Sequence, residues 1–370
     1  MPVEIVGMIG ANPPRGEANV HVIGGSIDVG YLQRFAQVHE ASDFDRVLVG
    51  YSSASADGFL LTQAAAAATE RIRFLLAHRP GFVSPSLAAR KAATLDSLTG
   101  GRVAMHIISG GSDVEQHRDG DYVDHDGRYR RSAEFMQILR QSWAASEPFD
   151  FEGEFYHLEG AYSDVEALPG GIPIYYGGQS EAALKAARYC DVFAMWGEPL
   201  AAVREKIDEV YGVTDPHGFR PGISVSFRPI LGRTEDEAWD KAHDLLKRIL
   251  DNPGRPGPLP LGSDAARPEA VGSRRLLDLA DEKEIHDERL WLPIAAATGA
   301  AGNTSALVGT PAQVVESLIR YYDLGVRTIL IRGFDPLEDA EDYGRELIPL
   351  LREAVAARDR AVPESAGTRA

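Results

Sequence analysis

The sequence predicts one α/β domain, a (β/α)8 TIM barrel with insertions, on two observations. Short apolar runs alternate with amphipathic stretches along most of the 370 residues, a pattern typical of parallel strands joined by helices. About eight strand–helix pairs can be counted, which favours a closed barrel over the alternative, a doubly wound sheet. The length accommodates such a barrel with insertions, although length alone would also fit two average domains.

The predicted strands are short and mostly apolar, as expected for strands covered on both faces. They span residues 3–9, 46–49, 72–78, 103–108, 174–176, 192–196, 224–231 and 328–332. The fourth strand runs into the loop Ser109–Ser112, which contains two glycines. Such a loop leaves backbone N–H groups free for a ligand, although an ordinary turn between strand and helix has the same composition.

Helical patterns separate the strands, and several begin at recognisable capping residues. They span residues 30–41, 58–69, 84–97, 132–145, 180–189, 201–210, 235–250 and 311–324, with a last helix near 337–357. Ser84-Pro85 and Thr310-Pro311 each place an N-cap before a proline in the first turn, and Thr234–Glu237 offers a capping box.

Two stretches interrupt the repeat. Residues 147–171 contain FDFEGEFYHLEG, which predicts a β-hairpin inserted after the fourth strand. Residues 252–303, before the eighth strand, begin with a Pro/Gly-rich run and are too long for a connector, so they form a candidate lid; a solvated ornament or an oligomer contact is the alternative. The barrel domain is expected over 1–357, followed by a disordered tail at 358–370.

Composition narrows the classes of partner. Lys and Arg total 38 against 55 Asp and Glu, giving a formal charge of −17, which disfavours binding to nucleic acid or anionic membranes and favours a small-molecule partner. The single cysteine, Cys190, excludes an internal disulfide and is expected to be a packed structural thiol. Without a basic n-region or a long apolar run, the chain is expected to be cytoplasmic.

Active sites of (β/α)8 barrels lie at the C-terminal ends of the strands. There the motif YYGGQS, followed by a helical pattern, predicts a phosphate site made by Gly177, Gly178 and Ser180. No HxH or HExxH spacing indicates a metal site, and no GxSxG motif indicates a serine hydrolase.

Four segments together resemble one family. They are SPSLAARKAATLDSLTGGR at 84–102, VDHDGRYRRSAEF at 123–135, YYGGQSEAALKAARYCDVFAMWGEP at 175–199 and ALVGTPAQVVESLIRYYDLGV at 306–326. They look like the bacterial luciferase-like flavin monooxygenases, and within these most like the alkanesulfonate monooxygenase branch. The resemblance covers roughly residues 28–355, and it is weaker in the insertion at 252–303.

The resemblance implies a cofactor, a reaction and a set of contacts. Reduced FMN, supplied by a separate NAD(P)H-dependent flavin reductase, would react with O2 to give a peroxyflavin, which oxygenates a sulfonate to an aldehyde and sulfite. The positions that match the family's flavin contacts are Asp57, His106, Ser109, Tyr129, Gly178 and Ser180. His106 is a departure, because the sulfonate branch usually has asparagine there.

The substrate pocket departs further from that branch. Its arginine and histidine on the seventh strand become Ser226 and Arg228, and its lid arginine becomes Ala300. Its cysteine after the second strand becomes Ser55, and its tyrosine after the eighth becomes Phe334.

Two arginines can replace the lost positive charge. Arg228 and the additional Arg332 could hold a sulfonate or carboxylate, unless Arg228 is an exposed strand-end residue and Arg332 pairs with Asp335 or Glu338. Trp196 matches a tryptophan of the branch and could wall the pocket or simply pack in the core. Arg228, Arg332, Ser55 and Trp196 are therefore the candidate catalytic residues.

Three hypotheses for the function follow. The first is a two-component monooxygenase that uses reduced FMN and O2 to desulfonate a small organosulfonate, with a sugar sulfonate favoured by the polar Ser55, Ser226 and Asn303. The second is an FMN or deazaflavin oxidoreductase of the same superfamily, and the third is a flavin-binding protein without catalysis. The resemblance also implies a homodimer or homotetramer.

Overall fold

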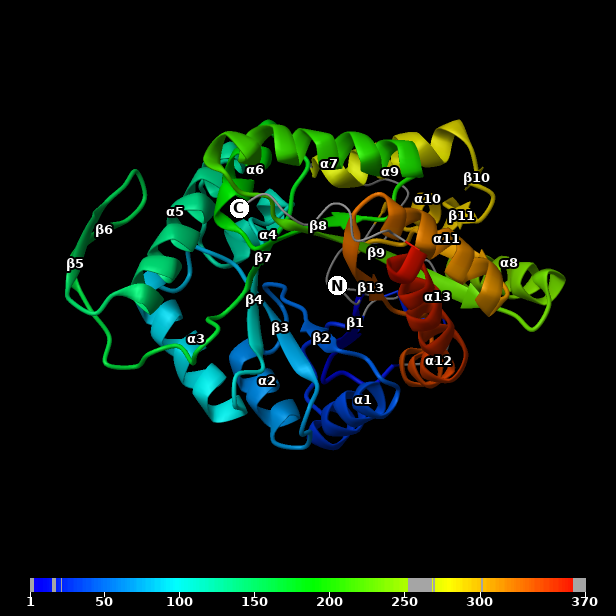
Figure 1. Cartoon of the computed structure of the whole chain (residues 1–370), viewed down its shortest axis with the longest axis horizontal. Coiled ribbons are helices and arrows are strands. Elements are labelled where there is room, and N and C mark those ends of the chain that lie inside the picture. Colours follow the sequence, from blue (N-terminus) through cyan, green and yellow to red (C-terminus); the bar gives the residue numbers. More distant parts are fainter. Residues whose placement is uncertain are drawn as a thin grey trace.

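The computed structural model describes residues 3–361 except 15–17, 21, 252–267, 269 and 301. Within this part, eight parallel strands close into a barrel because β9 pairs with both β8 and β13. The strands are β1 (Glu4–Ile9), β2 (Arg46–Val49), β3 (Arg73–His78), β4 (Val103–Ile107), β7 (Ile174–Tyr176), β8 (Val192–Trp196), β9 (Gly222–Leu231) and β13 (Val326–Ile331). The predicted fold class is confirmed, and Figure 1 shows the helices surrounding these strands.

The helices around the barrel largely follow the sequence pattern. They are α1 (Val29–Ala41), α2 (Gly58–Ala66), α3 (Pro85–Thr99), α5 (His125–Ala144), α6 (Glu181–Ala186), α7 (Leu200–Thr214), α11 (Pro311–Asp323), α12 (Pro336–Asp342) and α13 (Ile348–Ala361). Ser84 caps α3 by accepting from the Leu87 N–H, and Thr310 forms a capping box with Gln313 at α11. Both of these predicted caps are therefore present, and Thr234 accepts from the Glu237 N–H at 3.2 Å at the start of α8 (Glu235–Asp251).

The start of α5, the loop after β4 and the end of α13 differ from the prediction. Helix α5 begins at His125 rather than at residue 132, because Asp124 caps it by accepting from the Gly127 N–H at 2.6 Å. A short helix, α4 (Asp113–Arg118), forms in the loop after β4. Helix α13 continues to Ala361, past the predicted end at residue 357, and residues 362–370 of the predicted tail lie outside the described residues.

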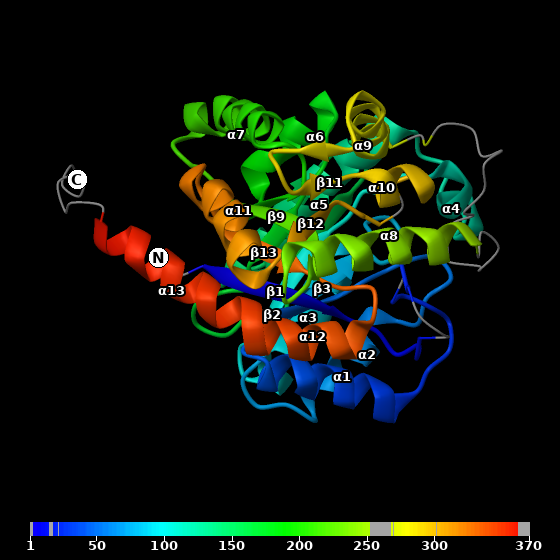
Figure 2. The ribbon, with the colours of Figure 1, turned by 90° about the vertical axis from the view of Figure 1, so that its right-hand side faces the viewer.

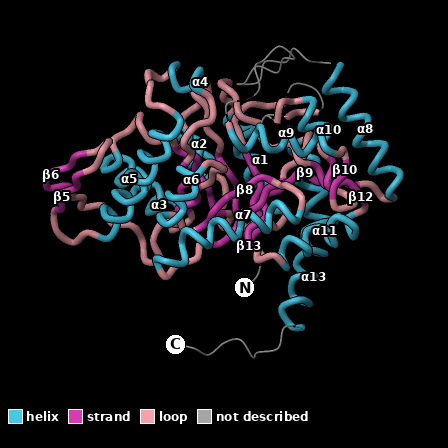
Figure 3. Tube along the Cα trace, turned by 90° about the horizontal axis from the view of Figure 1, so that it is seen from above, coloured by secondary structure: helices cyan, strands magenta, loops and turns pink. Residues whose placement is uncertain are grey.

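The first insertion is the predicted hairpin. Strands β5 (Phe149–Glu152) and β6 (His157–Ala161) pair antiparallel and lie at one end of the molecule, away from the barrel, in both Figure 1 and Figure 3. Glu134 of α5 accepts hydrogen bonds from the N–H groups of Glu154, Phe155 and Tyr156, which attaches the hairpin to that helix.

The second insertion is partly built into the sheet. After α8 (Glu235–Asp251) come α9 (Val271–Glu282), β10 (Ile285–His286), β11 (Leu290–Trp291), α10 (Pro293–Ala297) and β12 (Ala306–Gly309). Strand β12 pairs in parallel with the C-terminal half of β9, and β11 and β10 extend the sheet antiparallel. Trp291 and Ile294 pack against α8 in a small core, and Figure 2 shows α9 and α10 stacked above α8.

The predicted lid therefore has parts of different character. Residues 252–267, 269 and 301 lie outside the described residues, while β10 and β11 extend the sheet and α10 packs against α8 and α9. The start of α9 lies against residues at the ends of β4, β7 and β8. The described helices include none that is long and apolar enough to cross a membrane.

The N-terminal end of the barrel interior contains a polar network. The Glu4 carboxylate accepts from Arg46 Nε at 3.1 Å, from the Tyr175 hydroxyl at 2.5 Å and from the Thr328 hydroxyl at 3.3 Å, and it pairs with Arg73 Nη2 at 3.0 Å. These partners come from β2, β7, β13 and β3, so one carboxylate on β1 ties five strands together.

Candidate active site

The register of the barrel brings several predicted site residues to one place. Trp196 of β8 pairs with Ser226 of β9, and Ser226 pairs with Leu330 of β13, two residues before Arg332. On β4, His106 follows the inward-facing Ala104 by two positions. Because alternate residues of a strand point to the same side, His106, Trp196, Ser226 and Arg332 all face inward at the C-terminal end of the barrel.

His106 is a neutral group at this end. Burial lowers its pKa from 6.5 to about 4, so the imidazole carries no charge at neutral pH. Its Nδ1 atom is buried and has no hydrogen-bond partner in the described part of the chain. A neutral ring with a free nitrogen can donate to or accept from a ligand, depending on its tautomer.

The predicted phosphate site is assembled from two elements. A Cβ atom on Gly178 would lie 2.5 Å from Ala183 Cβ and 2.9 Å from Tyr129 Cε1, so the backbone after β7 lies directly against the Tyr129 ring of α5. Ser180 accepts from the Ala183 N–H at 3.2 Å and caps α6, which leaves its hydroxyl proton free to donate. Gly178, Tyr129 and Ser180 are thus brought together.

Three other predicted residues have local partners. Ser109 shares a 2.8 Å hydrogen bond with Ser132 of α5. Asp57 caps α2 by accepting from the Leu60 N–H at 3.0 Å, and its side chain is exposed. The Ser55 hydroxyl donates to the Ser52 carbonyl at 2.9 Å and accepts from the Ser52 N–H at 3.0 Å, so it stabilises its own turn.

Buried polar atoms without partners surround the C-terminal end of the barrel. Among the described residues these include His106 Nδ1, Gln179 Oε1, Nε and Nη1 of Arg79, and both amide atoms of Gln116. Buried polar groups normally find partners, so these atoms are free to form hydrogen bonds with a polar ligand. The edges of a flavin ring carry the donors and acceptors that such groups need, and the residues present therefore fit FMN.

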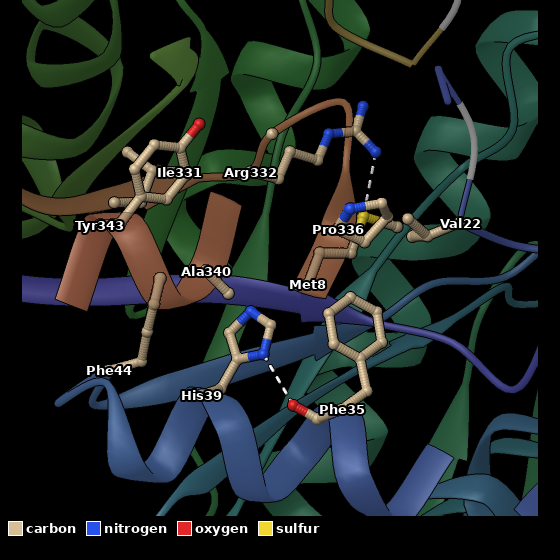
Figure 4. A pocket seen from close by; sticks show the side chains of 11 residues that line it. Met8, Val22, Phe35, His39, Phe44, Ile331, Arg332, Pro336, Ala340 and Tyr343 are labelled. Atoms are coloured by element: carbon tan, nitrogen blue, oxygen red, sulfur yellow. Dashed lines mark hydrogen bonds between the residues drawn. The ribbon is translucent and has the colours of Figure 1, made fainter. Parts of the chain in front are cut away.

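Arg332 is a cation without an acidic partner. In the described structure its Nη1 donates to the Met8 sulfur at 3.0 Å and its Nη2 to the Asn303 carbonyl at 3.3 Å, and no carboxylate pairs with it. Burial lowers its pKa to about 10, so it remains protonated at neutral pH. Figure 4 shows Arg332 and Met8 meeting at a small cavity between β1, β13, α1 and α12.

The predicted pairing of Arg332 with Asp335 or Glu338 is absent from the described residues. The nearby acid Asp339 instead accepts from the N–H groups of Phe334 and Asp335 at 2.7 and 2.8 Å. Burial raises the pKa of Asp339 to about 6, so its carboxylate is still mostly ionised at neutral pH, but its hydrogen bonds go to these two backbone N–H groups and not to Arg332. Arg332 is therefore available to an anionic ligand.

Arg228 is buried, not exposed at a strand end, and it is surrounded by carbonyl groups. Its Nε donates to Asn303 O at 3.1 Å, its Nη1 to Gly333 O at 3.0 Å and Asn19 O at 3.4 Å, and its Nη2 to Val20 O. Burial, together with the charge of Arg332, lowers its pKa well below the ordinary value. The two guanidinium groups thus converge on one carbonyl, that of Asn303.

Helix α9 covers one side of this end of the barrel. A Cβ on Gly272 would lie 3.2 Å from Gln179 Cγ and 4.0 Å from the Trp196 ring, and a Cβ on Gly111 would lie 3.1 Å from Ala270. Residues at the ends of β4, β7 and β8 therefore contact the start of α9.

An ion pair attaches α9 to the barrel. Arg275 Nε donates to Glu198 Oε2 at 2.7 Å, and Gln179 Nε2 donates to Glu198 Oε1 at 3.5 Å. Burial raises the pKa of the Glu198 carboxyl in spite of the opposing effect of Arg275. Sequence reasoning missed Arg275, and its only signal was an amphipathic pattern inside the insertion.

No cluster of three or more His, Cys, Asp or Glu side chains suited to a metal ion occurs among the described residues. Cys190 is buried, and burial raises the pKa of its thiol, in keeping with an unreactive core cysteine.

A (β/α)8 barrel with polar side chains at the C-terminal ends of its strands is an architecture that many enzymes share. The family model of luciferase-like monooxygenases matches residues 8–328. The chain belongs to this family.

Solved structures show the same fold. A riboflavin lyase with modified FMN and riboflavin superposes with a TM-score of 0.77 at 16% identity, covering 96% of this chain and 92% of that one. The EDTA monooxygenase of Chelativorans sp. BNC1 gives 0.71 at 18% identity, with 96% and 95% covered. An F420-dependent secondary alcohol dehydrogenase gives 0.67 at 17%, with 95% and 99% covered. At these identities the comparisons establish the fold alone.

Proposed function

We propose that the protein is a two-component monooxygenase that uses reduced FMN and O2 to oxygenate a small organic anion, with an organosulfonate as the first choice. The observation that carries this proposal is Arg332, a cation at the C-terminal end of the barrel whose present acceptors are a thioether and a carbonyl. A guanidinium in such a place suits the oxygens of a sulfonate or carboxylate.

The cofactor belongs at the same end of the barrel. Gly178, Ser180 and Tyr129 would hold the phosphate, and His106 would meet the ring through its unpartnered nitrogen. When bound, reduced FMN together with O2 supplies the oxygen atom and the electrons of the reaction. A separate NAD(P)H-dependent reductase in the cytoplasm would supply the reduced cofactor.

The surrounding residues would orient the substrate and exclude water. Trp196 faces inward beside Ser226 and contacts α9, so it can form one wall of the substrate pocket. Helix α9, attached by the Arg275–Glu198 pair, would limit the access of water. Ser55 is held in its own turn and would contribute shape and polarity rather than proton transfer.

The test is sulfite release in the presence of reduced FMN and a generic flavin reductase, across alkyl, aryl and sugar sulfonates. Sulfite together with the matching aldehyde from one class would support the proposal and identify the substrate class. Arg332→Met should abolish that release, while Arg220→Met, which changes an exposed arginine paired with Asp215, should not. FMN binding without sulfite from any sulfonate would contradict the desulfonation reaction.

A further inference from the structure

The two arginines at the C-terminal end of the barrel differ in the hydrogen bonds that each would lose on turning toward a ligand. Arg332 contacts the Met8 sulfur and the Asn303 carbonyl. A thioether is a weak acceptor, and it can remain buried without a partner. The Asn303 carbonyl would keep its 3.1 Å hydrogen bond from Arg228 Nε. Arg332 can therefore move to an anion without leaving a strong buried acceptor unsatisfied.

Arg228, in contrast, cannot turn toward a ligand without breaking hydrogen bonds to buried carbonyl groups. Its guanidinium holds the carbonyls of Val20, Gly333 and Asn303, which belong to three separate segments of the chain, and it lies 4.7 Å from the centre of the Phe334 ring. Turning it toward a ligand would remove hydrogen bonds from all three segments, and buried carbonyls without partners are costly.

The shared carbonyl is itself fixed in place. Asn303 Nδ2 donates to Ser226 O at 2.7 Å and to Ser226 Oγ at 2.5 Å, and its Oδ1 accepts from the Ser305 hydroxyl at 3.0 Å. Its φ of 50° lies in the left-handed region, which asparagine tolerates better than most residues. Asn303 thus connects the end of the second insertion to β9 and to both arginines.

We infer that Arg228 is a positioning residue and Arg332 is the ligand of the substrate anion, with the Asn303 carbonyl as the link between them. The inference rests on the proposed function and assigns separate roles to two residues that the sequence presents as equivalent. Arg228 keeps the Asn303 carbonyl hydrogen-bonded, and this frees Arg332 for the anion. Without Arg228, the anion and the carbonyl would compete for Arg332.

The experiment is a double-mutant cycle on the equilibrium binding of methanesulfonate, measured by calorimetry on the full chain. Arg332→Met should weaken binding roughly a hundredfold, because charge-assisted hydrogen bonds to the anion are lost. Arg228→Lys keeps the charge but loses the forked geometry, and it should weaken binding roughly tenfold. In the Arg332→Met background, Arg228→Lys should have no further effect.

Two further variants separate this role from a general effect on folding. Asn303→Gly suits the left-handed backbone but removes the amide that fixes the carbonyl, so it should reproduce the loss seen for Arg228→Lys. Arg220→Lys, at an exposed site, is the matched control and should bind methanesulfonate as the wild type does. FMN affinity, measured on each variant, should stay within twofold of the wild type if the fold is intact.

Additive effects of the two arginine substitutions would overturn the inference, because they would mean that both side chains contact the anion. Wild-type affinity in Arg228→Lys or Arg332→Met would overturn it as well, as would the absence of methanesulfonate binding to the wild type. Binding with the expected hierarchy but without sulfite release would contradict desulfonation and leave the assignment of the two arginines supported.

Discussion

The Glu4 network inside the barrel leads to a quantitative prediction for Glu4→Gln. The Glu4 side chain is 17% exposed and Arg46 is 4% exposed, so the substitution leaves a buried guanidinium without its charge partner. Breaking a buried ion pair by removing one partner costs about 3–5 kcal/mol. An unfolding entropy of about 2.1 cal/mol/K per residue over 370 residues converts this loss into a Tm lower by about 4–6 °C.

The pH dependence of the stability lost in Glu4→Gln provides an independent check. Burial acts to raise the Glu4 pKa, but Arg46, Tyr175 and Arg73 together lower it below its ordinary value of 4.5. The stabilisation is therefore complete above pH 4.5 and disappears as the pH falls through the lower pKa of the folded protein. The Tm difference between wild type and Glu4→Gln should accordingly narrow in acid.

Differential scanning calorimetry at a fixed scan rate, from neutral pH down into the acid range, would measure both effects. Glu181→Gln is the matched control, since Glu181 forms an exposed pair with Lys185 and its loss should leave Tm nearly unchanged. A Tm for Glu4→Gln within 1 °C of the wild type at neutral pH, or a difference that does not change with pH, would refute the reasoning.

Three further predictions concern the cofactor site, the attachment of helix α9 and the stability of the protein in acid. Gly178→Ala should weaken FMN binding at least roughly tenfold in a fluorescence titration, because the new methyl group overlaps Ala183 and Tyr129, whereas Gly212→Ala, in open space, should not. Arg275→Met should speed hydrogen exchange in α9 relative to the exposed control Arg274→Met, and unchanged exchange would count against the Glu198 attachment. His106 has a pKa of about 4 in the folded protein, against an ordinary value of 6.5. Its contribution to stability is therefore present above pH 6.5 and is lost as the pH falls toward 4. His106→Asn should reduce that part of the acid-induced fall in Tm.

The barrel was predictable because its signals are local. Each strand is a short apolar run bounded by polar residues, and caps such as Ser84 and Thr310 mark helix starts within a few residues. The added sheet was not predicted, since β10 and β11 have two residues each and show no periodicity.

The candidate site was predictable in location but less so in its contacts. Strand ends identify His106, Trp196 and Arg332, because residues at the C-terminal ends of parallel strands meet at one end of a barrel. The partners of Arg228 were not predictable, since the Val20 carbonyl lies 208 positions away in the sequence and is a backbone group with no sequence signature.

Strand β9 pairs with three other strands, and this has a consequence for how the second insertion is attached to the barrel. Its first part, through Phe227, pairs with β8 and β13 in the barrel, and from Arg228 onward it pairs with β12. The neighbour of β9 therefore changes at Arg228. The second insertion is attached to the barrel there through β12, and it displaces no barrel strand. A change in the length or sequence of the insertion is therefore expected to leave the eight-stranded wall intact, provided that the hydrogen bonds between β9 and β12 are kept.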